Sequence, residues 1–102
     1  NQMERRKHSR KTCFFAEVDY RTKTQVYTDP IRDISTGGVF IETENMLAVG
    51  EGVSMVFEDY THIDLIHVAG DVVRKSPNGV AVRFDIPDGV KLKNMSKFID
   101  MV

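Results

Sequence analysis

The sequence predicts an all-β domain, a barrel or a sandwich of short strands, that ends in one helix. Three observations predict this fold class. Hydrophobic and polar residues alternate with a period of two through most of residues 13–85, turn-forming residues interrupt the alternation, and the period becomes helical after Pro87. With 102 residues, 41% hydrophobic and 28% charged, the chain has the length and composition of a single globular domain.

The first two strands are expected over residues 13–21 and 26–33. In the first, the alternation places Val18 and Tyr20 together on one face. The second is less regular. Pro30 within it predicts an edge or a bulge, because proline has no N–H to donate to a neighbouring strand.

The later strands show the clearest alternation, with Val80, Val82 and Phe84 on one face of the last of them. A strand over residues 63–74 must change phase near His67, as it would at a β-bulge. These later strands are expected over residues 39–43, 53–57, 63–74 and 80–85. Turn-forming residues separate them at Gly50–Gly52, Glu58–Thr61 and Pro77–Gly79.

A closing helix is predicted after Pro87. Asp88 can cap its first turn, and four apolar side chains then recur on one helical face. We expect that face to pack on the β-structure. Its members are Leu92, Met95, Ile99 and Val102.

The formal net charge of −1 conceals an uneven distribution. Residues 1–11 carry five basic side chains and one acid, a net of +4, and the rest of the chain carries −5. We therefore expect a flexible basic arm over residues 1–12 and a domain over residues 13–102. The arm indicates an anionic partner, although a solvated, disordered terminus would have the same composition.

Several classes of function are not expected. No apolar run approaches the roughly 18 residues that a membrane-spanning helix requires. The single cysteine, Cys13, cannot form an internal disulfide, which favours a reducing cytoplasm. One cysteine and three scattered histidines predict no zinc site, and no set of residues has catalytic spacing. We expect neither an enzyme nor a bound metal or cofactor.

Two motifs remain. Arg6 to Arg10 form an R-x-x-x-R spacing, of which this composition predicts about half of one match by chance. Residues 33–38 form D-x-S-x-x-G, for which about 0.03 chance matches are expected. A turn explains the glycines of the second motif, because glycine permits positive φ. It explains Asp33 and Ser35 less well, since residues two apart share one face of an extended segment.

Together the two motifs resemble the signature of the PilZ domain family, bacterial receptors for the second messenger cyclic di-GMP. Residues 78–84 also resemble the last barrel strand of that family, so the resemblance extends from residue 5 to about residue 85. It implies a six-stranded antiparallel barrel with a terminal helix. The residues that match the signature in order and spacing are Arg6, Arg10, Asp33, Ser35 and Gly38.

The resemblance implies that the arginines bind the ligand, a dianion with two guanine bases. The planar guanidinium fork can bind a phosphate or the N7/O6 edge of guanine with two hydrogen bonds, and both roles remain open for Arg6 and Arg10. Arg5 directly precedes the motif. In the family, an arginine there is associated with binding a stacked pair of ligands.

The resemblance assigns the remaining ligand contacts to the second motif. The carboxylate of Asp33 suits the N1–H and N2–H donors of guanine, and the hydroxyl of Ser35 suits a phosphate or a base edge. Gly37 and Gly38 would let the backbone approach the ligand. Ordering a flexible arm costs about 2–5 kcal/mol against roughly 1.5–3 kcal/mol for each charge-assisted bond. We therefore expect both arginines to be required and the arm to become ordered on binding.

The leading hypothesis is a non-enzymatic cyclic di-GMP receptor that signals to an unidentified protein partner. One alternative is a protein-interaction adaptor that has lost the ligand. Another is a small nucleic-acid-binding barrel whose strand aromatics stack on bases. The acidic domain argues against the latter, as does the apparent placement of Phe14, Phe40 and Phe57 in core patterns. Arg83 is expected on the outer face as a solvated arginine.

Overall fold

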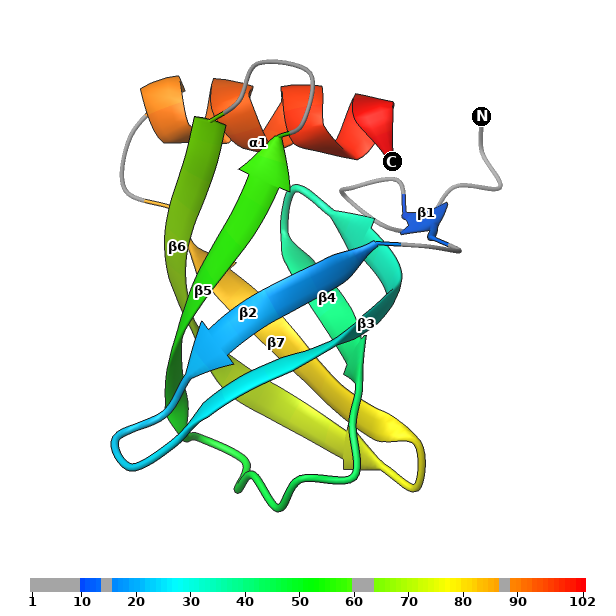
Figure 1. Ribbon diagram of the computed structural model, residues 1–102, viewed down its shortest axis with the longest axis vertical. Helices are drawn as coiled ribbons and strands as arrows, with labels where there is room; N and C mark the ends of the chain where they lie inside the picture. The colour runs from blue at the N-terminus through cyan, green and yellow to red at the C-terminus, as the bar shows by residue number, and fades with distance from the viewer. Residues whose placement is uncertain (1–9, 14–15, 60–63, 87–88) are drawn as a thin grey trace.

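The structure, a computed structural model, describes residues 10–13, 16–59, 64–86 and 89–102. Figure 1 shows a β-barrel with one helix lying across an end. The predicted all-β fold with a C-terminal helix is confirmed. The elements are β1 (Lys11–Thr12), β2 (Glu17–Arg21), β3 (Val26–Ser35), β4 (Gly38–Glu42), β5 (Gly52–Asp59), β6 (Asp64–Ser76), β7 (Gly79–Asp85) and α1 (Gly89–Met101).

Six of the strands form a closed antiparallel barrel. Their order is β3-β2-β5-β6-β7-β4, and β4 pairs again with β3 to close the sheet. β1 adds two residues to β3, where Lys11 pairs with Ile34 and Thr12 with Asp33. This pairing brings the start of the described chain alongside the end of β3.

The irregularity expected near Pro30 is a bulge two residues later. The register between β3 and β4 shifts between Ile31 and Asp33, which leaves Arg32 as the additional residue. Arg32 and Asp33 are therefore both opposite Phe40 of β4.

The bulge in β6 lies farther along the strand than we expected. The register with β7 shifts between Val72 and Arg74, whereas the pairing with β5 runs unbroken past His67. The expectation was wrong because the alternation from Ile66 to Val72 needs no change of phase. Ile66, Val68 and Val72 are buried on one face, and Leu65 is 59% exposed on the other.

The helix closes one end of the barrel (Figure 1). Its buried side chains are Met95 and Phe98, and the ring of Phe98 lies 5.2 Å from that of Phe57 in the core. Ile99 packs against the same core, but Leu92 is 44% exposed. The packed face is therefore centred on Met95 and Phe98 rather than on the row that begins at Leu92.

A buried polar network lies toward the other end of the barrel. The Tyr20 hydroxyl donates to Asp29 Oδ2 at 2.7 Å and lies 3.0 Å from Thr43 Oγ1. Asn45 Nδ2 donates to the same carboxylate at 3.1 Å and to Thr43 Oγ1 at 2.8 Å. Burial raises the pKa of Tyr20 to about 12. The network ties the connection after β4 to β2 and β3.

Replacement Tyr20→Phe should lower the free energy of unfolding by about 1–3 kcal/mol, because it removes a hydroxyl that partners buried polar groups. Urea denaturation measures the loss. Tyr27→Phe is the control, since its hydroxyl lies outside the network although the two rings are 5.2 Å apart. Equal losses in the two variants would contradict this role.

The stability of the protein should also fall as the pH rises from 10 to about 12. The first value is the ordinary pKa of tyrosine, and the second is the pKa of Tyr20 in the folded chain. In that range the unfolded chain has lost the proton that the folded chain retains, so ionisation favours unfolding, while below pH 10 the contribution is fully present. Unfolding free energies at about pH 9 and about pH 11 should differ more in the unaltered chain than in Tyr20→Phe. Parallel pH dependences would exclude Tyr20 as the source.

Candidate functional site

The D-x-S-x-x-G motif spans the hairpin between β3 and β4. β3 ends at Ser35, β4 begins at Gly38, and Thr36 and Gly37 form the turn. Asp33 and Ser35 share the outer face of the barrel, because Ile34 between them is fully buried in the core. The motif therefore connects two strands, as the sequence predicted.

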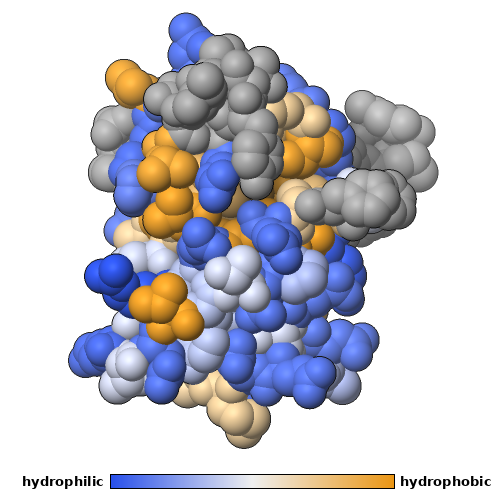
Figure 2. All heavy atoms as spheres, in the orientation of Figure 1, coloured by the Kyte–Doolittle hydropathy of each residue, from blue (hydrophilic) through white to orange (hydrophobic). Residues whose placement is uncertain are grey.

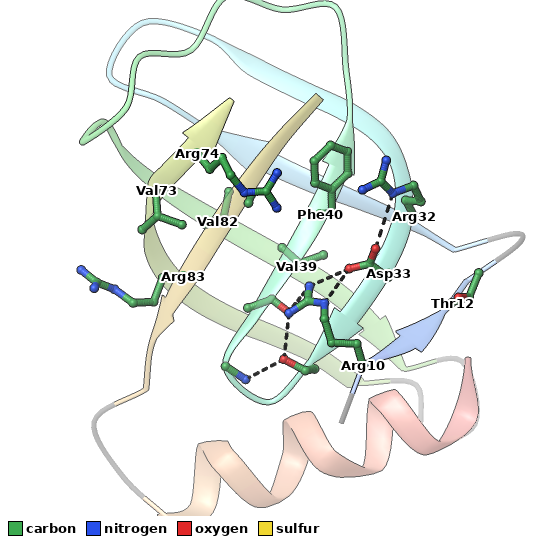
Figure 3. A pocket seen from close by; sticks show the side chains of 14 residues that line it. Arg10, Thr12, Arg32, Asp33, Val39, Phe40, Val73, Arg74, Val82 and Arg83 are labelled. Atoms are coloured by element: carbon green, nitrogen blue, oxygen red, sulfur yellow. Dashed lines mark hydrogen bonds and ion pairs between the residues drawn. The ribbon is translucent and has the colours of Figure 1, made fainter. Parts of the chain in front are cut away.

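Arg10 lies across this hairpin (Figure 3). Its Nε donates to Asp33 Oδ1 at 2.8 Å, its Nη1 donates to Ser35 Oγ at 3.2 Å, and its Nη2 lies 3.5 Å from the carbonyl oxygen of Gly38. Nη2 is also 2.7 Å from Asp33 Oδ1. The last residue of the first motif thus contacts three residues of the second, from a position 23 residues before Asp33.

Asp33 contacts a second arginine. Arg32 Nε lies 3.4 Å from Asp33 Oδ2, so each carboxylate oxygen faces a different guanidinium group. The side chains of Arg10 and Asp33 are only 28% and 22% exposed. Partial burial and the additional hydrogen bonds make this pair better defined than an ordinary surface ion pair, which is worth about 0–1 kcal/mol.

The turn between β3 and β4 also holds the hydroxyl group of Ser35 in place. The Gly37 N–H donates to Ser35 Oγ at 3.1 Å, and the Gly37 carbonyl accepts from the Phe84 N–H at 2.9 Å. Ser35 is 2% exposed, and its Oγ is the atom that accepts the hydrogen bond from Arg10. The turn and the side-chain cluster are one structure, so the motif serves both the local fold and the site.

Gly38 is required by packing. A Cβ atom there would collide with the backbone carbonyl of Val82 on β7, to which β4 is paired. Glycine consequently permits the close approach of two strands directly beneath Arg10.

The site opens into a cavity of about 730 Å³ on the outer wall formed by β3, β4, β6 and β7. That volume is within the range of small-molecule sites. Among the described residues, four arginines and one acid, Asp33, line it, so this wall is strongly cationic. The arginines are Arg10, Arg32, Arg74 and Arg83. Arg83 is on the outer face as expected, and its Nη2 pairs with Asp71 at 3.1 Å.

Phe40 was expected in a core pattern, and its side chain is buried, but it lies outside the core cluster. It lies on the outer face, opposite Asp33 and Ala81, because its neighbours in β4 point into the core. It is nevertheless only 1% exposed, since arginines cover it. Arg32 Cζ is 3.7 Å and Arg74 Cζ 5.9 Å from the ring centroid. The alternation of β4 could have revealed the orientation of Phe40, but not its arginine neighbours.

The predicted ligand contacts of Arg5 and Arg6 fall outside the described residues and stay predictions. Cys13 is buried, and burial, together with the nearby Asp33 carboxylate, raises the pKa of its thiol, which opposes reactivity. No group of three or more potential metal ligands occurs among the described residues. No helix in the described part of the chain is long and apolar enough to span a membrane.

Comparison with known proteins gives one family and several similar folds. A family model described as the PilZ domain matches residues 4–99. The crystal structure of the PilZ domain of CeSA from a cellulose-synthesizing bacterium aligns with a TM-score of 0.74 at 11% identity, over 91% of this chain and 96% of that one. No curated protein sequence matches.

Two further solved structures are similar. The inhibitor of motility MotI/DgrA of Bacillus subtilis aligns with a TM-score of 0.77 at 14% identity, over 96% of this chain. The alignment covers 51% of that protein, so the chain spans about half its length. An uncharacterized Legionella protein aligns with a TM-score of 0.58 at 12% identity, over 91% of each chain. At these identities the likeness is one of fold.

Gly38→Ala should lower the free energy of unfolding by roughly 2–3 kcal/mol, because the added methyl group meets a backbone carbonyl that cannot move without disturbing the β4–β7 pairing. Thermal or urea unfolding measures the loss. Gly89→Ala is the matched control, since its Cβ would meet open space. A Gly38→Ala variant as stable as this control would contradict the packing argument.

Proposed function

The chain belongs to the PilZ domain family, and on that premise we propose that it is a non-enzymatic receptor that binds cyclic di-GMP and signals to a protein partner. PilZ domains are generally receptors for this messenger and are generally non-catalytic. One observation carries the proposal for this chain: Arg10 meets Asp33, Ser35 and Gly38 in a single cluster at the mouth of a cationic cavity.

The charge of the cavity supports a small dianion as the ligand. Guanidinium groups bind phosphate oxygens or the N7/O6 edge of guanine, and the cavity offers four of them. Asp33 is the one acid that the described part of the chain contributes to the lining, and its carboxylate is suited to the N1–H and N2–H donors on the opposite edge of guanine. One wall of the barrel thus carries cationic partners for the phosphates and the N7/O6 edge of guanine, and an acidic partner for the N1–H and N2–H edge.

Binding would exchange the partners of Arg10 as the arm becomes ordered over the ligand. Asp33 and Ser35 hold Arg10 over the hairpin. Holding it there reduces the entropy lost on binding. The ligand must then replace part of the Arg10–Asp33 contact, so that the guanidinium turns to a phosphate or a guanine and the carboxylate to a base. Arg6 and Arg5 would add further cations from the arm.

A contact between the arm and the helix offers a route for the signal. Lys11 follows Arg10, and its Nζ donates to the carbonyl oxygen of Asp100 near the end of α1 at 3.2 Å. Movement of Arg10 toward a ligand would shift this contact, because the two residues are adjacent in the chain. The helix is therefore the part of the barrel that we expect to report binding to a partner. We place the receptor in the cytoplasm, because the single cysteine, Cys13, is a free thiol and free thiols are typical of reducing compartments.

The nucleic-acid alternative has less support from the described surface. Single-stranded nucleic acids bind to exposed aromatic side chains. The large hydrophobic side chains exposed in the described ranges are Val, Met and Leu, and Phe40 is covered. The adaptor alternative is addressed by the binding experiment.

Calorimetric titration should show that the chain binds cyclic di-GMP and that Arg10→Ala weakens binding about 10- to 100-fold, since one or two charge-assisted bonds are lost. Arg21→Ala is the matched control, because this exposed arginine of β2 does not line the cavity. Arg5→Leu should reduce the number of ligands bound per chain if a stacked pair binds.

Undiminished affinity in Arg10→Ala would contradict the assigned site. A complete absence of binding by the unaltered chain would favour the adaptor hypothesis. Strongly salt-dependent binding to single-stranded oligonucleotides, without binding to the dinucleotide, would favour the nucleic-acid hypothesis. A ratio of one ligand per chain would contradict the paired ligand.

A further inference from the structure

We infer that Arg32, packed over the ring of Phe40, forms a stacking platform for a guanine base of the ligand. This inference rests on the proposed function and adds a recognition residue that lies outside both motifs. It follows from the geometry of the cavity wall shown in Figure 3, where Phe40 lies between Arg32 and Arg74, and Asp33 lies beside Arg32.

The bulge in β3 creates the platform. Arg32 is the additional residue of that bulge, so it and Asp33 both lie opposite Phe40, where a regular strand would present one residue. Arg32 Cζ is 3.7 Å from the centroid of the Phe40 ring, the distance of a stacked contact. Arg32 Nε also faces Asp33 Oδ2 at 3.4 Å. The ring and the carboxylate together fix the plane of the guanidinium.

Phe40 itself is unable to receive a base. It is 1% exposed, with Arg32 on one side and Arg74 at 5.9 Å. Two small residues make room for this arrangement. Ala81 separates Phe40 from Arg74 across β7, and a Cβ at Gly79 would come within 2.9 Å of the ring. The aromatic ring is therefore a support, and the surface that it offers to the cavity is a guanidinium.

The outer face of that guanidinium is accessible. The Arg32 side chain is 44% exposed and lines the same cavity as Arg10. Asp33 lies between the two arginines, with one oxygen toward each. A guanine that presents its N1–H and N2–H edge to Asp33 brings its ring beside Arg32. Planar guanidinium groups stack on bases, which a lysine ammonium does not do.

The substitution Arg32→Lys tests the inference, because it keeps the charge and removes the plane. In calorimetric titrations of the full chain with cyclic di-GMP, Arg32→Lys and Arg32→Gln should each weaken binding roughly tenfold. Phe40→Leu should weaken it severalfold by releasing Arg32. Arg21→Lys, the same change outside the cavity, should bind like the unaltered chain.

Wild-type affinity in Arg32→Lys would overturn the stacking role, and a loss in Arg32→Gln alone would show that only the charge matters. Arg32 is at the surface, so these variants keep the test valid even if Phe40→Leu fails to fold. Failure of the proposed function is distinguishable, because the unaltered chain would then not bind cyclic di-GMP. If the chain binds and Arg10→Ala weakens binding while both Arg32 variants do not, the stacking inference alone is wrong.

Discussion

The site depends on one carboxylate. Asp33 stands between the guanidinium groups of Arg10 and Arg32 and accepts contacts from both. Without it, two like charges would face each other on a wall that already carries Arg74 and Arg83. The opposed charges keep both arginines in place over the β3–β4 hairpin, and the hairpin in turn depends on the close approach that Gly38 permits. Electrostatics and backbone packing are therefore joined at the same few residues.

Irregular strands make this wall different from the rest of the barrel. In a regular strand, alternate side chains face outward, which leaves one outward position for every two residues. Each bulge adds a residue, Arg32 in β3 and Val73 in β6, on strands that flank β4 and β7. The wall consequently holds more outward side chains than its length would otherwise permit. It is crowded enough to cover Phe40 almost completely.

Local patterns in the sequence were sufficient for the strands and for the shared face of Asp33 and Ser35. Alternation depends only on neighbouring residues, so the buried positions of Val18, Tyr20, Val80 and Val82 follow from it. The position of the bulge in β6 could not be predicted from alternation, because a bulge depends on the register between two paired strands. The cover over Phe40 likewise depends on Arg32 and Arg74, which the fold brings there from two other strands. The family resemblance assigned Arg10 and Asp33 to one ligand site but did not predict their direct contact, since no local pattern relates residues 23 positions apart.

The gathering of four arginines on one wall has a kinetic consequence. Most of the acidic side chains lie beyond the first eleven residues, where the chain carries a net −5, yet the described lining of this cavity contains a single acid. The cavity wall therefore carries a positive field that attracts small anions. Such fields raise association rates and weaken as ionic strength rises. The rate at which a small anion reaches this cavity thus depends on the whole charge distribution and not only on the residues that line the cavity.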